Sequence, residues 1–166
     1  GVDIIFHNPR NTTSQNSQFL LWMYEGARID FSLDSSSKYI RGDISQITFG
    51  AWNHIMVCVD FTQVLNADKG RIFVNGVDAT TLVNIASNPQ IFANASNSLH
   101  LGEDANGYQS PYGGNLDEFA IWAGTDQRAN VSEIYSSSGA VDLNNLPTAP
   151  QPTTWQRFGD NGATWN

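Results

Sequence analysis

The loop from Glu103 to Gly114 holds the side chains best suited to bind a ligand. Its candidate ligand-binding residues, which lie between glycines, are Asp104, Asn106, Tyr108, Gln109 and Tyr112. Aromatic faces stack on sugar rings, and carboxylate and amide groups exchange hydrogen bonds with hydroxyls. A turn alone accounts for the same composition, because turns require Asp, Asn, Gly and Pro. The turn is the preferred interpretation, and the ligand site is the alternative.

Two adjacent acids, Asp117 and Glu118, invite an enzymatic interpretation. A retaining glycosidase needs two carboxyl groups about 5–5.5 Å apart, whereas neighbours on a strand point to opposite faces of the sheet. The three histidines, His7, His54 and His100, each stand beside strand-forming residues, and no G-x-S-x-G motif accompanies them. The chain is therefore predicted not to be an enzyme.

Composition narrows the choice of partners. The 166 residues include 16 acidic and only eight basic ones, for a net charge of −8. Binding to nucleic acid or to an anionic membrane would need a basic patch, so neither partner is predicted. The single cysteine, Cys58, lies in an apolar run and is expected to be a small core residue with no disulfide partner in the chain.

The residues that must position these side chains have the patterns of strands. Residues 55–59 form an unbroken, β-branched apolar run typical of a buried strand. Residues 71–74 and 77–81 flank Asn75-Gly76, a pair that tolerates the positive φ angles of a type I′ turn, so a hairpin is expected.

A second hairpin is predicted from residues 19–24 and 28–33, which turn at 25–27. In its second strand, Ile29, Phe31 and Leu33 alternate with three polar residues, Arg28, Asp30 and Ser32. This period of two predicts one buried face and one face in water.

One short helix is expected over residues 131–138. Asn130 and Glu133 have the N-x-x-E spacing of a capping box, and Gly139 stands where a C-terminal cap belongs.

The spine of the chain also resembles a known family. Trp52 and His54 precede an apolar strand that ends in Asp60, and I-x-V-N-G-V follows at 72–77. In the same order come LHLG at 99–102, GNLDEFAIW at 114–122 and SEIY at 132–135. These blocks, which cover roughly residues 18–140, resemble laminin G-like domains, relatives of pentraxins and concanavalin-type lectins. The resemblance implies an all-β, antiparallel two-sheet jelly-roll sandwich that lacks the family's first strands.

The resemblance also bears on the site. It implies that calcium is the candidate cofactor, held by oxygens from separate loops, although no cofactor is certain. The candidate metal ligands are Asp60, Asp104, Asn106 and Asp117. Related glucanases carry an E-x-D-x-E run that this sequence lacks, which agrees with the prediction that it is not an enzyme.

Three segments are predicted: residues 1–141 as the sandwich, 142–154 as a Pro-rich linker, and 155–166 as a tail that begins a further module. The W-x-R-x-G-D opening of the tail resembles the start of a module in structural proteins of marine bacterial viruses.

We therefore expect a non-enzymatic structural and adhesion module of a virion or other extracellular assembly. It would dock on neighbouring subunits of that assembly and bind surface glycans. The alternative is a secreted carbohydrate-binding module of a larger enzyme or cell-surface protein.

Overall fold

The computed structural model describes residues 2–9, 17–24, 26–33, 35–85, 99–102 and 110–158. The chain divides into two compact units, Gly1–Gly113 and Gly114–Asn166, and each is described by itself. Among the described residues, none of the helices has the length and apolar character needed to cross a membrane.

The larger sheet of the first unit has the strand order β10-β1-β2-β3-β4-β8, with β9 also paired to β1. Its strands are β1 (Val2–Pro9), β2 (Ser17–Tyr24), β3 (Arg28–Leu33), β4 (Ser35–Gly42), β8 (Thr80–Asn84), β9 (His100–Leu101) and β10 (Ser110–Pro111). Every pairing is antiparallel except that of β1 with β10. The predicted hairpin of β2 and β3 is confirmed.

The smaller sheet of the first unit contains β5 (Ile55–Val59), β6 (Gly70–Val74) and β7 (Val77–Asp78), with a 3-10 turn at Asn66–Asp68 between β5 and β6. Asn75 and Gly76 have φ angles of 50° and 79°, which confirms the predicted tight turn.

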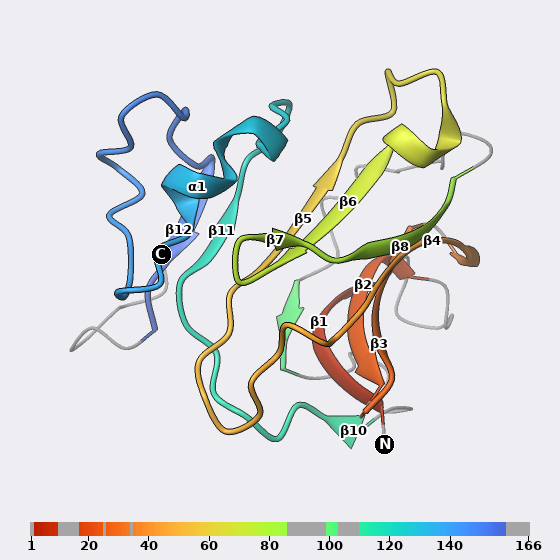
Figure 1. The fold of residues 1–166 in the computed structure, drawn as a ribbon. Helices are drawn as coiled ribbons and strands as arrows, with labels where there is room; N and C mark the ends of the chain where they lie inside the picture. Colours follow the sequence, from red (N-terminus) through yellow and green to blue (C-terminus); the bar gives the residue numbers. More distant parts are fainter. Residues whose placement is uncertain are drawn as a thin grey trace. The chain divides into compact units, whose positions relative to one another are not determined.

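The strand predicted over 77–81 is divided between the two sheets, because the chain changes sheet at Ala79. The Ala79 N–H donates to Ile72 of β6 at 2.9 Å, and its carbonyl accepts from Asp43 N, just after β4, at 2.8 Å. The Thr80 hydroxyl then accepts from Ile72 N at 2.9 Å. The Ile72 N–H of β6 therefore has an acceptor even though the backbone at Thr80 has joined the other sheet. Figure 1 shows β7 and β8 as consecutive parts of one green segment.

The core of the first unit lies between these two sheets. Its buried members are Leu21, Ile29, Phe31, Leu33, Ile40, Ile72, Val74, Ala79, Val83 and Ile85. The sheets approach closely at Gly70 of β6, where an added Cβ would lie 2.3 Å from Ile40 Cδ1 of β4. An apolar layer shared by two sheets is the arrangement of a β-sandwich, and the predicted all-β antiparallel class is confirmed.

The prediction that the polar residues of β3 face water is wrong at two positions. Asp30 and Ser32 have only 2% and 3% of their surface exposed. Asp30 is covered because Arg28 of the same strand and Arg41 of the neighbouring β4 both contact its carboxylate. A paired carboxylate can be buried where an isolated one cannot.

The second unit combines a two-stranded sheet with a short helix. β11 (Phe119–Ile121) pairs antiparallel with β12 (Thr154–Gln156), and a 3-10 turn at Arg128–Asn130 leads into α1 (Val131–Ile134). The helix is confirmed but ends earlier than predicted, since the Tyr135 N–H closes it on Val131 at 2.9 Å. Gly139 is therefore not its cap.

The predicted capping box is also wrong. Asn130 makes no side-chain cap and instead donates to Gln127 Oε1 at 2.8 Å. Glu133 binds a distant segment, accepting from the N–H groups of Thr148 and Ala149 at 3.0 and 2.9 Å. These hydrogen bonds lower the pKa of the Glu133 carboxyl below its ordinary value, with the bond from the Thr148 hydroxyl as the largest cause.

The segment predicted as a Pro-rich linker is tied to the second unit at several points. Leu143 and Ala149 are buried, and the Trp122 indole donates to the Pro150 carbonyl at 2.7 Å. The Thr153 N–H donates to the Ile121 carbonyl at 2.7 Å and leads directly into β12. Residues 142–153 therefore form a strap along this unit. The division into segments at 141 and 154 stays a prediction.

Candidate functional site

The predicted ligand loop is described only at its end. Asp104, Asn106, Tyr108 and Gln109 lie outside the described residues, so their role as ligand-binding residues stays a prediction. Tyr112 follows β10 and is half-buried, and its N–H donates to the Gly102 carbonyl at 2.8 Å. This bond closes the base of the loop.

The candidate metal ligands divide in the same way. Asp104 and Asn106 lie outside the described residues, whereas Asp60 belongs to the first unit and Asp117 to the second. Asp60 is engaged locally, because Oδ1 accepts from Thr62 N at 2.9 Å and Oδ2 from Gln63 Nε2 at 2.6 Å. In the part of the chain that the structure describes, His, Cys, Asp and Glu side chains form no group of three able to hold a metal. Calcium stays a prediction.

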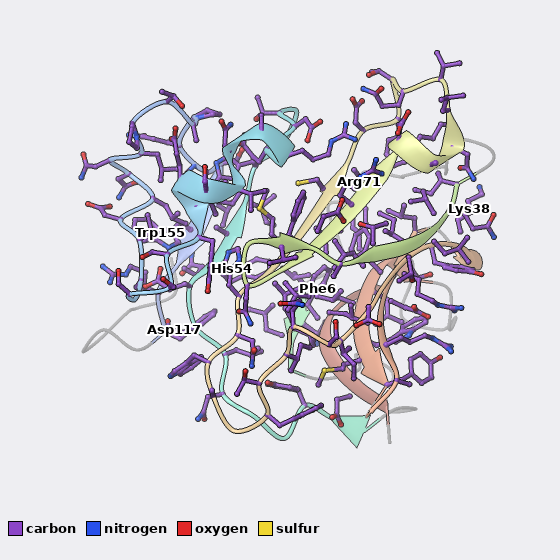
Figure 2. The ribbon with its side chains drawn as sticks, viewed as in Figure 1. Phe6, Lys38, His54, Arg71, Asp117 and Trp155 are labelled. Carbon is purple, nitrogen blue, oxygen red and sulfur yellow. The ribbon has the colours of Figure 1, made fainter. Side chains whose placement is uncertain are left out.

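Asp117 and Glu118 fix the segment around β12. Asp117 Oδ1 accepts from the N–H groups of Glu118 and Phe158 at 2.9 and 2.7 Å. The Glu118 carboxylate accepts from Trp155 Nε1 at 2.6 Å and from Arg157 Nε at 2.8 Å. Figure 2 labels Asp117 and Trp155 in this unit. Both acids are therefore engaged in hydrogen bonds to the C-terminal segment.

A braced loop between β4 and β5 exposes two large aromatic side chains. Phe49 is 61% and Trp52 is 68% exposed, whereas aromatic residues of this size are usually well covered. Between them, the Asn53 amide donates to the carbonyls of Thr48 and Ala51, both at 2.9 Å, and its Oδ1 accepts from Thr48 N at 2.9 Å. We call residues 43–54 the aromatic loop.

The β6–β7 turn holds the aromatic loop from outside. Asn75 Nδ2 donates to the Gln46 carbonyl at 2.7 Å and to Asn53 Oδ1 at 3.0 Å. Asn75 Oδ1 accepts from the His54 N–H at 2.8 Å. The loop is thus hydrogen-bonded at its middle and at its end to a rigid hairpin. Sequence reasoning did not select Phe49 or Trp52 as binding residues, because these contacts join positions far apart in the chain.

His54, at the end of the aromatic loop, is partly buried, and its Nδ1 atom is shielded from solvent. Burial lowers its pKa below the ordinary value, because an apolar environment disfavours the charged form. His54 is consequently neutral near pH 7, as a structural histidine is expected to be.

The outward face of the larger sheet carries a second cluster. Arg41 Nε and Nη2 donate to the two carboxylate oxygens of Asp30 at 2.8 and 3.0 Å, and Arg28 Nε donates to Asp30 Oδ2 at 3.0 Å. The hydrogen bond to Asp30 raises the pKa of Arg41.

Aromatic rings support both arginines. The Arg28 guanidinium lies 4.1 Å from the centre of the Tyr24 ring, and that of Arg41 lies 4.9 Å from the Tyr39 ring. Trp22 meets Tyr24 edge-on, with ring centres 6.1 Å apart. We call these six residues, Trp22, Tyr24, Arg28, Asp30, Tyr39 and Arg41, the arginine face.

Comparison with known proteins decides the family. A family model described as the concanavalin A-like lectin/glucanases superfamily matches residues 2–132. The chain belongs to this family. Searches of curated proteins and of solved structures gave no significant match. The predicted resemblance is confirmed at the level of the family.

The family assignment indicates what kind of site to expect. Concanavalin A-like domains of the lectin type are generally not catalytic and are carbohydrate-binding or adhesion modules. In this concanavalin A-like domain, the aromatic loop and the arginine face are two groups of described side chains whose chemistry suits contact with a ligand.

Proposed function

We propose that this concanavalin A-like domain is a non-enzymatic adhesion module of an extracellular assembly, such as a virion surface, and that it binds glycans through its aromatic loop. The observation that carries the proposal is the exposure of Phe49 and Trp52, 61% and 68%, on a loop fixed by the Asn53 and Asn75 amides. A sugar ring presents an apolar face of C–H groups that packs against an aromatic face.

Rigidity makes these two rings more effective in binding. A flexible loop would lose conformational freedom when a ligand ordered it, and that loss would weaken the affinity. Here the Asn53 and Asn75 hydrogen bonds hold the backbone before any ligand arrives. Other exposed polar residues of the same loop, such as Asp43 and Gln46, can exchange hydrogen bonds with sugar hydroxyls.

The roles of the acids support a non-enzymatic function. Asp117, Glu118 and Glu133 each accept hydrogen bonds that hold the C-terminal segment or the strap. A glycosidase would need a pair of carboxyl groups that flank a substrate bond, and these acids are committed elsewhere.

Glycan binding is tested with the full chain on a glycan array, followed by titration of each hit. We expect Trp52→Ala and Phe49→Ala each to weaken binding at least about tenfold, the equivalent of about 1.4 kcal/mol. The matched control is Val64→Ala, because Val64 is an apolar side chain, 93% exposed, on a different loop. Glycan binding that survives both aromatic substitutions, or no binding to any glycan, would contradict the proposal.

Whether the module belongs to an extracellular assembly or to an enzyme needs a separate test. Mass measurement of the natural polypeptide, with peptide sequencing beyond both ends, distinguishes the two settings. Further sandwich modules or virion proteins in the same polypeptide would support an extracellular assembly. A catalytic domain in that polypeptide would instead indicate a carbohydrate-binding module of an enzyme.

A further inference from the structure

The arginine face carries positive charge on a strongly acidic protein. The four strands β2, β3, β4 and β8 contain three basic residues, Arg28, Lys38 and Arg41, but only one acid, Asp30. The chain as a whole has a net charge of −8. The strand residues themselves therefore carry two more positive than negative charges, whereas the chain as a whole is negative.

An ordinary ion pair does not explain the cluster. Arg41 alone satisfies Asp30 through the two-pronged contact that guanidinium and carboxylate groups favour. Arg28 adds a second guanidinium to the same carboxylate, so one positive charge is left without a compensating charge in the cluster. The Arg28 side chain is 36% exposed, whereas that of Asp30 is 3% exposed. The excess charge therefore faces solvent.

The free donors of the cluster are held in place. Arg28 uses only Nε, and Arg41 uses Nε and Nη2, in their contacts with Asp30. Within the described residues, Nη1 and Nη2 of Arg28 and Nη1 of Arg41 have no acceptor. The Tyr24 and Tyr39 rings lie against the two guanidinium planes, which restricts their rotation. The remaining N–H groups are thus oriented before any ligand binds.

The neighbouring indole adds to the excess of donors. Trp22 is the register partner of Asp30 on β2, and its Nε1–H is buried with no acceptor in the described part of the chain. A buried donor without a partner is unfavourable. Because this indole N–H is buried, the donors that can reach a ligand are those of the two partly exposed arginines, which suit a negatively charged oxygen ligand.

We propose that the arginine face binds a carboxylate or sulfate group of an acidic saccharide, with Arg28 as the principal contact. Both groups present oxygens spaced to match a guanidinium fork, and the sugar ring that carries the group can lie over the flat sheet surface. This site is separate from the aromatic loop and does not depend on it.

The net charge of −8 does not prevent such binding. At about 0.15 M salt, charges more than about 8 Å away are largely screened. A bound anion therefore responds mainly to the guanidinium groups beside it.

The test is calorimetric titration of the full chain with three tetrasaccharides at about 0.15 M NaCl. Tetragalacturonate carries carboxylates, its fully methyl-esterified form has the same rings without charge, and sulfated cellotetraose carries sulfates. We expect binding of one or both charged ligands, which identifies the preferred oxyanion, and binding at least about tenfold weaker for the methyl ester.

Variants locate the site. Arg28→Gln leaves the contact between Arg41 and Asp30 intact and is expected to weaken binding at least about tenfold. Arg28→Lys, which keeps the charge but loses the fork, should give an intermediate loss. Arg71→Gln, on β6 of the smaller sheet (Figure 2), is the matched control and should leave binding unchanged. Thermal unfolding of each variant checks that it is folded.

Three results would overturn the inference: equal binding of the charged and esterified ligands, unchanged binding by Arg28→Gln, or no binding of either charged ligand. Trp52→Ala separates this site from the proposed glycan site of the aromatic loop. If Trp52→Ala abolishes binding of the acidic ligand while Arg28→Gln does not, the ligand binds at the aromatic loop, and only the present inference fails.

Discussion

The close approach of the two sheets in the first unit makes Gly70→Ala a strong test of the fold. An added Cβ at Gly70 would lie 2.3 Å from Ile40 Cδ1 and 2.6 Å from Ile40 Cγ1, whereas carbon atoms in contact prefer about 3.5–4.0 Å. Ile40 is 0% exposed, so its side chain cannot move into solvent. Overpacking of this kind costs about 1–3 kcal/mol. We expect Gly70→Ala to reach the upper part of that range, about 2–3 kcal/mol.

A companion substitution makes the cause specific. Ile40→Ala removes the atoms that would clash and leaves a cavity, at a cost of about 2–5 kcal/mol. In the double variant, the new methyl group at position 70 enters that cavity. The double variant should therefore lose less stability than the sum of the losses of the two single variants, with a favourable coupling of about 1–2 kcal/mol.

Urea unfolding followed by far-UV circular dichroism measures all three variants against the parent protein. Gly113→Ala is the control, because a Cβ there would meet nothing within 4 Å, and its effect should stay within about 0.5 kcal/mol. If Gly70→Ala matches Gly113→Ala, or if the Gly70 and Ile40 substitutions are additive, the proposed contact between β6 and β4 is wrong.

Two further predictions concern charge. Asp30→Asn should destabilise the protein by about 2–3 kcal/mol in urea unfolding. Breaking a fully buried pair costs about 3–5 kcal/mol, but the arginine partners Arg28 and Arg41 are 36% and 28% exposed. Asp68→Asn, at an exposed pair, should cost less than about 1 kcal/mol, and equal effects of the two substitutions would contradict the argument. His54 has a lowered pKa in the folded chain, so the unfolded chain binds the proton more readily, and the free energy of unfolding should fall as pH drops below about 6.5. Urea midpoints at several pH values should show this fall in the parent protein and a smaller fall in His54→Gln. Identical pH profiles for the two proteins would exclude His54 as the cause.

The parts of the fold that could be predicted are those set by neighbours in the sequence. Asn75-Gly76 specifies its turn through the φ angles that these two residues tolerate. The apolar residues of β3 give the correct core face, since the period of a strand is local. The prediction fails at Asp30 on the same strand, because its burial depends on Arg41, eleven positions away, which only the strand register brings alongside.

The same limit applies to the functional residues. The exposure of Phe49 and Trp52 depends in part on a distant residue. One of the two amides that brace their loop belongs to Asn75, which is 29 positions from its partner Gln46. Glu133 matched a local capping pattern, yet its carboxylate binds Thr148, 15 positions on. A side chain whose spacing fits a local pattern can still bind a distant partner, so spacing alone does not assign its contact.

The Asn75 amide has a chemical consequence as well as a structural one. Asn-Gly is the sequence most prone to deamidation, in which the Gly76 nitrogen attacks the Asn75 side-chain carbonyl carbon and ammonia leaves. In the folded chain that amide is held at both ends, by Gln46 and Asn53 on its nitrogen and by His54 on its oxygen. The reaction requires the amide to rotate away from these partners. Deamidation at this position therefore proceeds at the rate at which the turn opens, and the damage that accumulates records how long each molecule has spent unfolded.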